Sequence, residues 1–216
     1  MKELAVPAAG ILTAYLLGAI PFGLLVSRLR GVDIRRLGSG NIGATNVFRC
    51  VGKPWGILTF VCDLLKGFLA ARAIPIVIAM VQGDADPARG LAIGCACAAV
   101  AGHNWPVYLR FKGGKGIATS AGALLGIAWQ SVALGLVVWV LTFALTRYVS
   151  LASIAAAVTL GASGWLIYRN AGWALPTALT VLALAALWRH RANVQRLLAG
   201  TENRFERKKG KESTAS

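Results

Sequence analysis

Long runs without a charged residue alternate with short polar gaps along this chain, and this alternation limits the possible folds more than any other feature. Residues 4–27 and 117–146 are two such runs. Each exceeds the roughly 20 apolar residues that a helix needs to cross the hydrocarbon of a bilayer. Because the backbone cannot bond to water there, its N–H and C=O groups must bond within the segment, which favours helices. The sequence therefore predicts an all-α, polytopic membrane protein.

The placement of the basic residues agrees with this prediction. The net charge is +15, which in a soluble protein would suggest a nucleic-acid partner. Here lysine and arginine lie mostly in the polar gaps, as the positive-inside rule describes for cytoplasmic loops. We therefore expect membrane lipid as the surroundings and no nucleic acid. The cysteines lack the C-x-x-C spacing of a metal or redox site, so we expect no metal, no cofactor and no disulfide from Cys50, Cys62, Cys95 and Cys97.

The charges of the gaps also predict the topology. The gap at 28–53 carries six basic residues and one acidic residue, which places it in the cytoplasm, whereas the acidic gap at 83–89 belongs outside. Pro21 should kink or end the first helix. The run at 117–146 is too long for one span, and a hairpin turning near residues 129–131 brings the basic residues after Trp188 inside. This interpretation gives seven helical segments, N-terminus out and C-terminus in, with the hairpin either crossing the membrane or re-entrant.

A membrane domain, 1–203, and a short tail, 204–216, account for the chain. The tail is basic and low in complexity, so we expect it to be disordered and cytoplasmic, attracted to anionic lipid. The segment after Trp188 has the apolar spacing of an amphipathic helix that lies at the membrane surface, with Asn193 and Arg196 on nearby faces.

Two glycine-bearing polar segments carry most of the candidate chemistry. The first, 38–49, reads Gly-Ser-Gly-Asn-Ile-Gly-Ala-Thr-Asn-Val-Phe-Arg. Its hydroxyl and amide groups, on Ser39, Asn41 and Asn46, suit a ligand with hydroxyl or phosphate groups. Arg49 suits the oxygens of a phosphate. Taken alone, a flexible loop explains this segment equally well.

The second segment, 103–116, passes through a helix-breaking proline and ends in Lys-Gly-Gly-Lys-Gly. Its glycines can expose consecutive backbone N–H groups in an anion-binding nest, and Lys112 and Lys115 add positive charge at the same point. A basic turn between two membrane helices is the simpler interpretation when the segment is taken alone.

Asp63 and Lys66 interrupt the second apolar run. Ionisable groups at membrane depth are costly and usually face a bundle interior or a polar cavity. These two lie three residues apart on one helix face and can pair with each other. The sequence is compatible both with a structural ion pair and with a place in the site.

The two polar segments, with Asp63-Leu-Leu-Lys-Gly67 between them and a third segment at 193–202, resemble the motifs of the bacterial acyl-phosphate:glycerol-3-phosphate acyltransferases, the PlsY-type family. The motifs stand in the same order and cover almost the whole chain. The resemblance implies a multi-pass enzyme of the bacterial inner (plasma) membrane, with a seven-helix fold and an active site that faces the cytoplasm. It implies transfer of a fatty acyl group from acyl phosphate to sn-glycerol 3-phosphate, giving lysophosphatidic acid and inorganic phosphate for phospholipid biosynthesis.

That chemistry suits the residues. Neither histidine begins the H-x-x-x-x-D dyad typical of acyl-CoA-type glycerol-phosphate acyltransferases, because Tyr108 and Gln195 stand where the aspartate would be. An acyl phosphate already carries a good leaving group, so the protein has to hold two anions together and stabilise the oxyanion. The general base is either His103 or a phosphate oxygen of the substrate, and we favour the second. Either polar segment could bind the phosphate of either substrate, acyl phosphate or glycerol 3-phosphate.

The predicted site draws on residues from all of these segments. The catalytic candidates are Ser39, His103, His190 and Asn193. The candidates for substrate binding are Asn41, Asn46, Arg49, Lys66, Lys112, Gly113, Gly114, Lys115, Gly116, Ser150, Ser153, Arg196 and Glu202. We expect the monomer to be functional.

Two other functions fit parts of the pattern. A transporter of small organic phosphates also uses glycines and cations at broken helices, but its site lies near the membrane midplane, whereas the polar motifs here gather at one face. A lipid-binding scaffold without activity explains the basic tail but not the hydroxyl and amide residues of segment 38–49.

Overall fold

The structure, a computed structural model, describes residues 2–205, and within that range its regular elements are all helices, with no strand. The α-helices are α1 (Lys2–Ala19), α2 (Phe22–Arg28), α3 (Ala44–Cys50), α4 (Lys53–Gln82), α5 (Arg89–Asn104), α6 (Ile117–Leu125), α7 (Trp129–Thr146), α8 (Val149–Ile167), α9 (Ala174–Arg189) and α10 (Arg191–Leu198). Short 3-10 helices are η1 (Ile34–Arg36), η2 (Val107–Leu109) and η3 (Arg169–Ala171). Of the predicted tail, 204–216, all but the first two residues lie outside the described range.

Four helical stretches are long and apolar enough to cross a membrane, namely Ala5–Arg28, Lys53–Gln82, Trp129–Thr146 and Val149–Ile167. The shorter α9 is also apolar. The protein is therefore an all-α, multi-pass membrane protein, as expected. At 16 and 9 residues, α5 and α6 are shorter than the roughly 20 residues of a full span, so the count of seven segments stays a prediction.

The long run at 117–146 divides into two helices, α6 and α7. The break lies at residues 126–128, just before the expected turn at 129–131. The halves are unequal, with 9 and 18 residues. Gly126 is a poor helix former, and Ala128 is buried with an extended φ of −149°, so the chain turns before Trp129.

Pro21 ends the first helix, as expected. It has no N–H to donate and restricts the residue before it, so α1 stops at Ala19 and α2 starts at Phe22. The break takes the Ile20 carbonyl oxygen out of the regular helical ladder. Lys66 Nζ on α4 donates to that oxygen at 2.8 Å. The same oxygen also accepts the Phe22 N–H at 3.1 Å, so a lysine at membrane depth shares in bonding a backbone group at the helix break.

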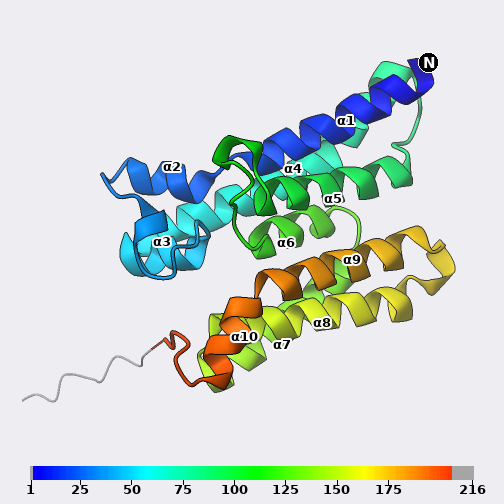
Figure 1. Ribbon diagram of the computed structural model, residues 1–216. Coiled ribbons are helices and arrows are strands. Elements are labelled where there is room, and N and C mark those ends of the chain that lie inside the picture. The colour runs from blue at the N-terminus through cyan, green and yellow to red at the C-terminus, as the bar shows by residue number, and fades with distance from the viewer. Residues whose placement is uncertain (1, 206–216) are drawn as a thin grey trace, which may run out of the picture.

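The helices form two units that lie side by side, α1–α6 and α7–α10 (Figure 1). In the first unit α1 packs on α5, and α4 packs on both α5 and α6. Glycines allow the closest of these approaches, because an added methyl group at Gly122 would lie 1.9 Å from the Leu64 carbonyl oxygen. Small residues at such crossings are typical of membrane helices, whose association depends on close packing.

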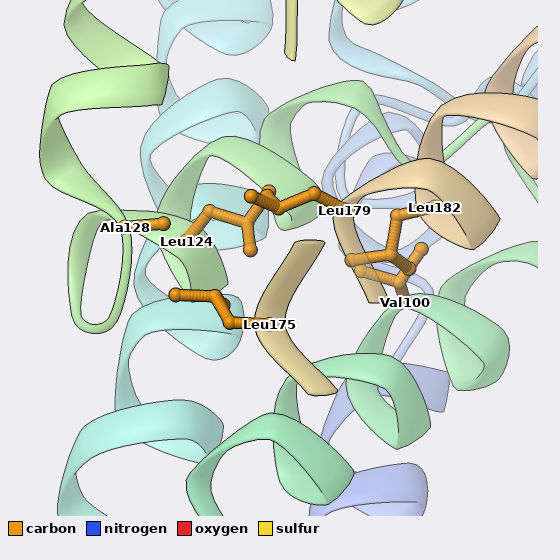
Figure 2. Packing of buried hydrophobic residues seen from close by; sticks show 6 residues of the cluster. All are labelled: Val100, Leu124, Ala128, Leu175, Leu179 and Leu182. Atoms are coloured by element: carbon orange, nitrogen blue, oxygen red, sulfur yellow. The ribbon is translucent and has the colours of Figure 1, made fainter. Parts of the chain in front are cut away.

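A cluster of buried apolar side chains joins the two units. Val100 of α5 and Leu124 of α6 pack there with three leucines of α9, Leu175, Leu179 and Leu182 (Figure 2). The short helices α2, α3 and α10 gather at one end of the molecule, and the N-terminus lies at the other end with the α8–α9 connection (Figure 1). The apolar junction therefore fixes α9 against α5 and α6. Helix α10 directly follows α9 and lies at the end where α2 and α3 gather, which we call the polar end.

Candidate functional site

A polar pocket of about 340 Å³ lies at the polar end, where three segments distant in sequence meet. Its lining comprises Ser39, Gly40 and Asn41 before α3, Gly113 and Lys115 before α6, and Arg189, Arg191, Ala192, Asn193, Gln195 and Arg196 at the end of α9 and on α10. The three predicted segments do converge. With one lysine and three arginines in its lining, the pocket suits an anion.

A cavity of about 290 Å³ near the other end of α4 has a different character. It is lined by α1, α4 and α5 with mostly apolar side chains such as Ile11, Ile78 and Leu91. No lysine or arginine of the described chain lines it, so of these two spaces the polar pocket is the one with charges that complement a phosphate.

Lys115 is one end of a hydrogen-bonded chain of side chains at the polar pocket. Its ammonium donates to Asn193 Oδ1 of α10. The other end of the same amide, Asn193 Nδ2, donates to Glu202 Oε1 at 2.7 Å. Arg196 Nε donates to Glu202 Oε2 at 2.8 Å. Glu202 thus orients Asn193 and Arg196 rather than facing a phosphate itself.

The pKa values of Lys115 and Glu202 are both lowered, which disfavours the charged form of the lysine and favours the charged form of the glutamate. Burial, opposed by Glu202 and aided by neighbouring arginines, lowers the pKa of Lys115 to about 8. Burial raises the pKa of Glu202, but its donors Asn193 and Arg196 outweigh that effect and hold the pKa below its usual value. At pH 7 Glu202 is therefore ionised, and Lys115 is mostly charged but close to its titration range.

His190 connects α9 to α10 and is buried. Its Nδ1 lies 2.7 Å from the Ala186 carbonyl oxygen. A carbonyl only accepts, so we assign the proton to Nδ1. Burial and the charge of Lys115 lower the pKa of His190 to about 4, which makes the ring neutral at pH 7. The neutral tautomer leaves Nε2 as a hydrogen-bond acceptor.

Asn46 organises the first polar segment from the inside. It is 4% exposed, and its Nδ2 lies within 3.3 Å of the carbonyl oxygens of Ile34, Leu37 and Asn41. Its Oδ1 accepts the Ser39 N–H at 3.1 Å. Asn46 therefore does not line the pocket. Instead it holds the loop that brings Ser39 and Asn41 there.

The loop between α5 and α6, residues 105–116, which we call the central loop, differs from the expected nest of free backbone N–H groups. The Gly114 N–H donates to the His103 carbonyl oxygen at 3.0 Å, so it is not available to a phosphate, and this part of the prediction is wrong. The glycine is needed for packing, because an added methyl group would lie 2.1 Å from His103 Nε2. Gly116 is buried at a φ of +78° and begins α6, which is a structural role.

Arg189 is a functional candidate that the sequence did not single out. Its Nε donates to the Gly114 carbonyl oxygen at 2.9 Å, and its Nη2 donates to the Gly113 carbonyl oxygen at 2.6 Å. The guanidinium also lines the pocket. In the sequence Arg189 is one of several cations that follow an apolar helix, which the positive-inside rule already explains. Only its position next to the catalytic candidate His190 was a signal.

His103 and Lys66 lie beneath the central loop rather than in the pocket lining. Lys66 Nζ is 2.8 Å from Asp63 Oδ1, with side-chain exposures of 1% and 3%. His103 Nδ1 is 3.6 Å from the same oxygen. We call Asp63, Lys66 and His103 the buried cluster. Its ion pair agrees with the structural alternative that the sequence allowed, and we assign it no substrate contact.

Four other predicted site residues are not part of the pocket lining. Lys112 is exposed. Arg49 donates from Nη2 to the Asn203 carbonyl oxygen at 3.2 Å. Ser150 is buried on the first turn of α8. Ser153 accepts from Trp139 Nε1 at 3.2 Å and so joins α8 to α7. Within residues 2–205, no three His, Cys, Asp or Glu side chains are grouped as a metal ion would require.

Comparison with known proteins places this arrangement among acyltransferases. The sequence model of the family described as glycerol-3-phosphate acyltransferase matches residues 8–200. A glycerol-3-phosphate acyltransferase of Desulforamulus reducens is 43% identical over 200 residues, covering 92% of this chain and 95% of that protein. One of Syntrophotalea carbinolica is 46% identical over 198 residues, covering 91% and 96%.

Solved structures agree in fold. A crystal structure of PlsY, an integral membrane glycerol 3-phosphate acyltransferase, in its glycerol 3-phosphate form has a TM-score of 0.80 and 39% sequence identity, covering 93% of this chain and 96% of that one. Its lysophosphatidic acid form has a TM-score of 0.77 at the same identity, covering 93% and 95%. The likeness therefore extends over the elements that form the pocket.

Proposed function

The chain belongs to the glycerol-3-phosphate acyltransferase family, and on this basis we propose that the polar pocket holds glycerol 3-phosphate while it is acylated. The protein is a glycerol-3-phosphate acyltransferase, an enzyme that joins a fatty acyl group to this substrate. The relatives and structures reported above are acyltransferases, which leaves the transporter and the scaffold without support.

The observation that carries the proposal is the position of Lys115. It lies where the three polar segments meet, next to Asn193, in a lining with three arginines. The phosphate of glycerol 3-phosphate complements these charges. Charge-assisted hydrogen bonds to phosphate are short and about twice as strong as neutral ones, so Lys115 and Arg196 are suited to hold that group.

The neutral polar groups of the pocket suit the glycerol part of the substrate. Ser39 and Asn41 line the pocket from the loop before α3, and Asn193 lines it from α10. Such hydroxyl and amide groups both donate and accept hydrogen bonds. Two substrates held in the right orientation react far faster than two free in solution, because their translational and rotational entropy is already lost on binding, before the chemical step.

Acyl phosphate is our proposed acyl donor. Neither His103 nor His190 begins an H-x-x-x-x-D dyad, and the pocket has cations to accommodate a second phosphate. In the transfer, the hydroxyl oxygen of glycerol 3-phosphate bonds to the acyl carbonyl carbon, and the carbon–oxygen bond to phosphate breaks. The products are lysophosphatidic acid and inorganic phosphate. Cations around the carbonyl stabilise the developing oxyanion.

A phosphate oxygen of the substrate is our proposed general base. His103 is 5% exposed and lies beneath the loop beside Asp63, which supports the substrate over this histidine as the base. The proton of the attacking hydroxyl then leaves with the phosphate. His190, held neutral by burial, remains an acceptor that can orient the hydroxyl.

The donor proposal is tested with purified protein. We expect phosphate release and acylated product from palmitoyl phosphate with glycerol 3-phosphate, and no comparable product from palmitoyl-CoA. Lysophosphatidic acid formed from palmitoyl-CoA at a rate matching palmitoyl phosphate would contradict acyl phosphate as the specific donor.

We further propose a monomeric enzyme of the bacterial inner membrane, with seven helical segments and the pocket facing the cytoplasm. The basic polar segments support this orientation because cytoplasmic loops are rich in lysine and arginine. Single cysteines at Asp84 and Thr201, in a cysteine-free background, should be labelled from opposite sides of the membrane. Labelling of both from one side would rule out the seven-segment topology.

A further inference from the structure

We propose that Arg189 is a positioning residue for acyl transfer, one that fixes the central loop so that Lys115 meets the substrate phosphate. The inference rests on the proposed function of the pocket. Arg189 ends α9, whereas the loop it contacts precedes α6, so the contact joins the two helical units directly at the pocket.

The contact is a fork. Two N–H groups of one planar guanidinium reach two successive carbonyl oxygens, those of Gly113 and Gly114, at 2.6 and 2.9 Å. Two bonds from one rigid plane fix the orientation of both peptide groups, not only their distance from α9. The carbonyl of Gly114 belongs to the peptide bond that begins Lys115. The fork therefore determines the direction in which the Lys115 side chain leaves the backbone.

The opposite side of the same loop is held by α5. The Gly114 N–H donates to the His103 carbonyl oxygen at 3.0 Å, so the loop is bonded through its N–H on one side and through its carbonyls on the other. Lys115 is the first side chain after this doubly held stretch, and its ammonium reaches Asn193. Without the fork, the loop keeps its contact with α5 but loses its alignment with α10.

Arginine is required for this role on geometric grounds. Lysine supplies the same charge but a single ammonium on a flexible stem, which cannot hold two carbonyls in a fixed plane. A shift of about 1 Å in a catalytic group is sufficient to lower a rate by about a hundred-fold. We therefore expect Arg189→Lys to lower kcat/KM for glycerol 3-phosphate about ten-fold, although the charge of the pocket is unchanged.

A double-mutant cycle with Lys115 tests the inference. If Arg189 acts through Lys115, Arg189→Lys should cost little more once Lys115→Ala is present, so the double variant should match Lys115→Ala within about two-fold. Independent sites give effects that multiply. The assay is the acylation of glycerol 3-phosphate with palmitoyl phosphate as donor, with kcat and KM determined separately and thermal unfolding measured for each variant.

Arg169→Lys is the matched control, because Arg169 is exposed at the other end of the α8–α9 pair and should retain wild-type kinetics. Losses that multiply in the double variant, or wild-type kinetics for Arg189→Lys, would overturn the positioning role. Should Arg189→Lys fail to accumulate, Arg189→Gln takes its place in the same cycle, with the same outcomes deciding. Wild-type kinetics for Lys115→Ala as well would instead reject the pocket as the substrate site.

Discussion

The buried cluster and the polar pocket both adjoin the central loop, and each contains a lysine within a network that includes a carboxylate. In the buried cluster, Lys66 bonds to Asp63 and to the Ile20 carbonyl oxygen, with both side chains sealed from solvent. In the pocket, Lys115 bonds to Asn193, which is in turn oriented by Glu202. The first lysine has its charge neutralised inside the protein, whereas the second is half-buried at the pocket and contacts a neutral amide.

This difference shows what turns a cation into a binding group. Lys115 shares its surroundings with Arg189, Arg191 and Arg196, so positive charge is in excess of what Glu202 balances. A buried charge must be paired with an opposite charge. An anion that enters the pocket pairs with its excess positive charge, whereas in the buried cluster Lys66 is already paired with Asp63. Residue type and membrane depth are thus poor guides to function unless the local charge balance is known.

The largest effect is expected from separating the buried pair. Asp63→Ala leaves the Lys66 ammonium buried without its counterion, which typically costs about 3–5 kcal/mol of stability. We expect a clear fall in unfolding temperature in detergent and in the amount of folded protein in membranes. Thermal unfolding of the purified variants measures this directly.

The double variant Asp63→Ala/Lys66→Met is its control, because it removes both charges and keeps most of the lysine's volume. Replacing a whole buried pair with apolar groups is often close to neutral, so stability should largely return, and activity with it. Recovered stability without activity would show that Lys66 takes part in substrate binding, as the sequence also allowed.

The opposite pattern is expected in the pocket. Lys115→Ala should leave stability nearly unchanged but remove a charge-assisted hydrogen bond to phosphate, which is worth about 1.5–3 kcal/mol. We expect kcat/KM for glycerol 3-phosphate to fall about ten-fold to a hundred-fold. Steady-state kinetics at equal protein levels tests this, and an unchanged kcat/KM would remove Lys115 from the site.

The pH dependence sharpens the same comparison. Because the pKa of Lys115 is lowered to about 8, its positive charge is present below that pH and is lost as the pH rises through it. The value of kcat/KM for glycerol 3-phosphate, which reports ionisation in the free enzyme, should therefore decline above about pH 8. Lys115→Arg keeps its charge at alkaline pH, so its profile should stay flat there whatever its absolute rate. A decline in both proteins would assign the titration to another group.

The sequence predicted the large features because they depend on local chemistry. Pro21 ends a helix wherever it stands, and cations gather on one side of a membrane, so the break after α1 and the meeting of three polar segments followed from residue types. The roles of Asn46, Gly114 and Arg189 did not follow from residue types. Each depends on which backbone N–H or carbonyl oxygen faces it after folding, and the sequence does not record this direction.

The smallest effect is expected for Lys112, and it separates two lysines that the sequence treats alike. Lys112 is exposed outside the lining, three residues before Lys115. A solvated cation near lipid contributes only about 1 kcal/mol to membrane attachment, which the apolar helices already provide, so Lys112→Ala should change kcat/KM by less than about two-fold. Lys208→Ala, outside the described residues, should behave in the same way. If Lys112→Ala instead matched Lys115→Ala, a substrate phosphate would have to reach Lys112 as well. The two hydrogen bonds of Arg189 would then position a loop that carries two substrate-binding lysines rather than Lys115 alone.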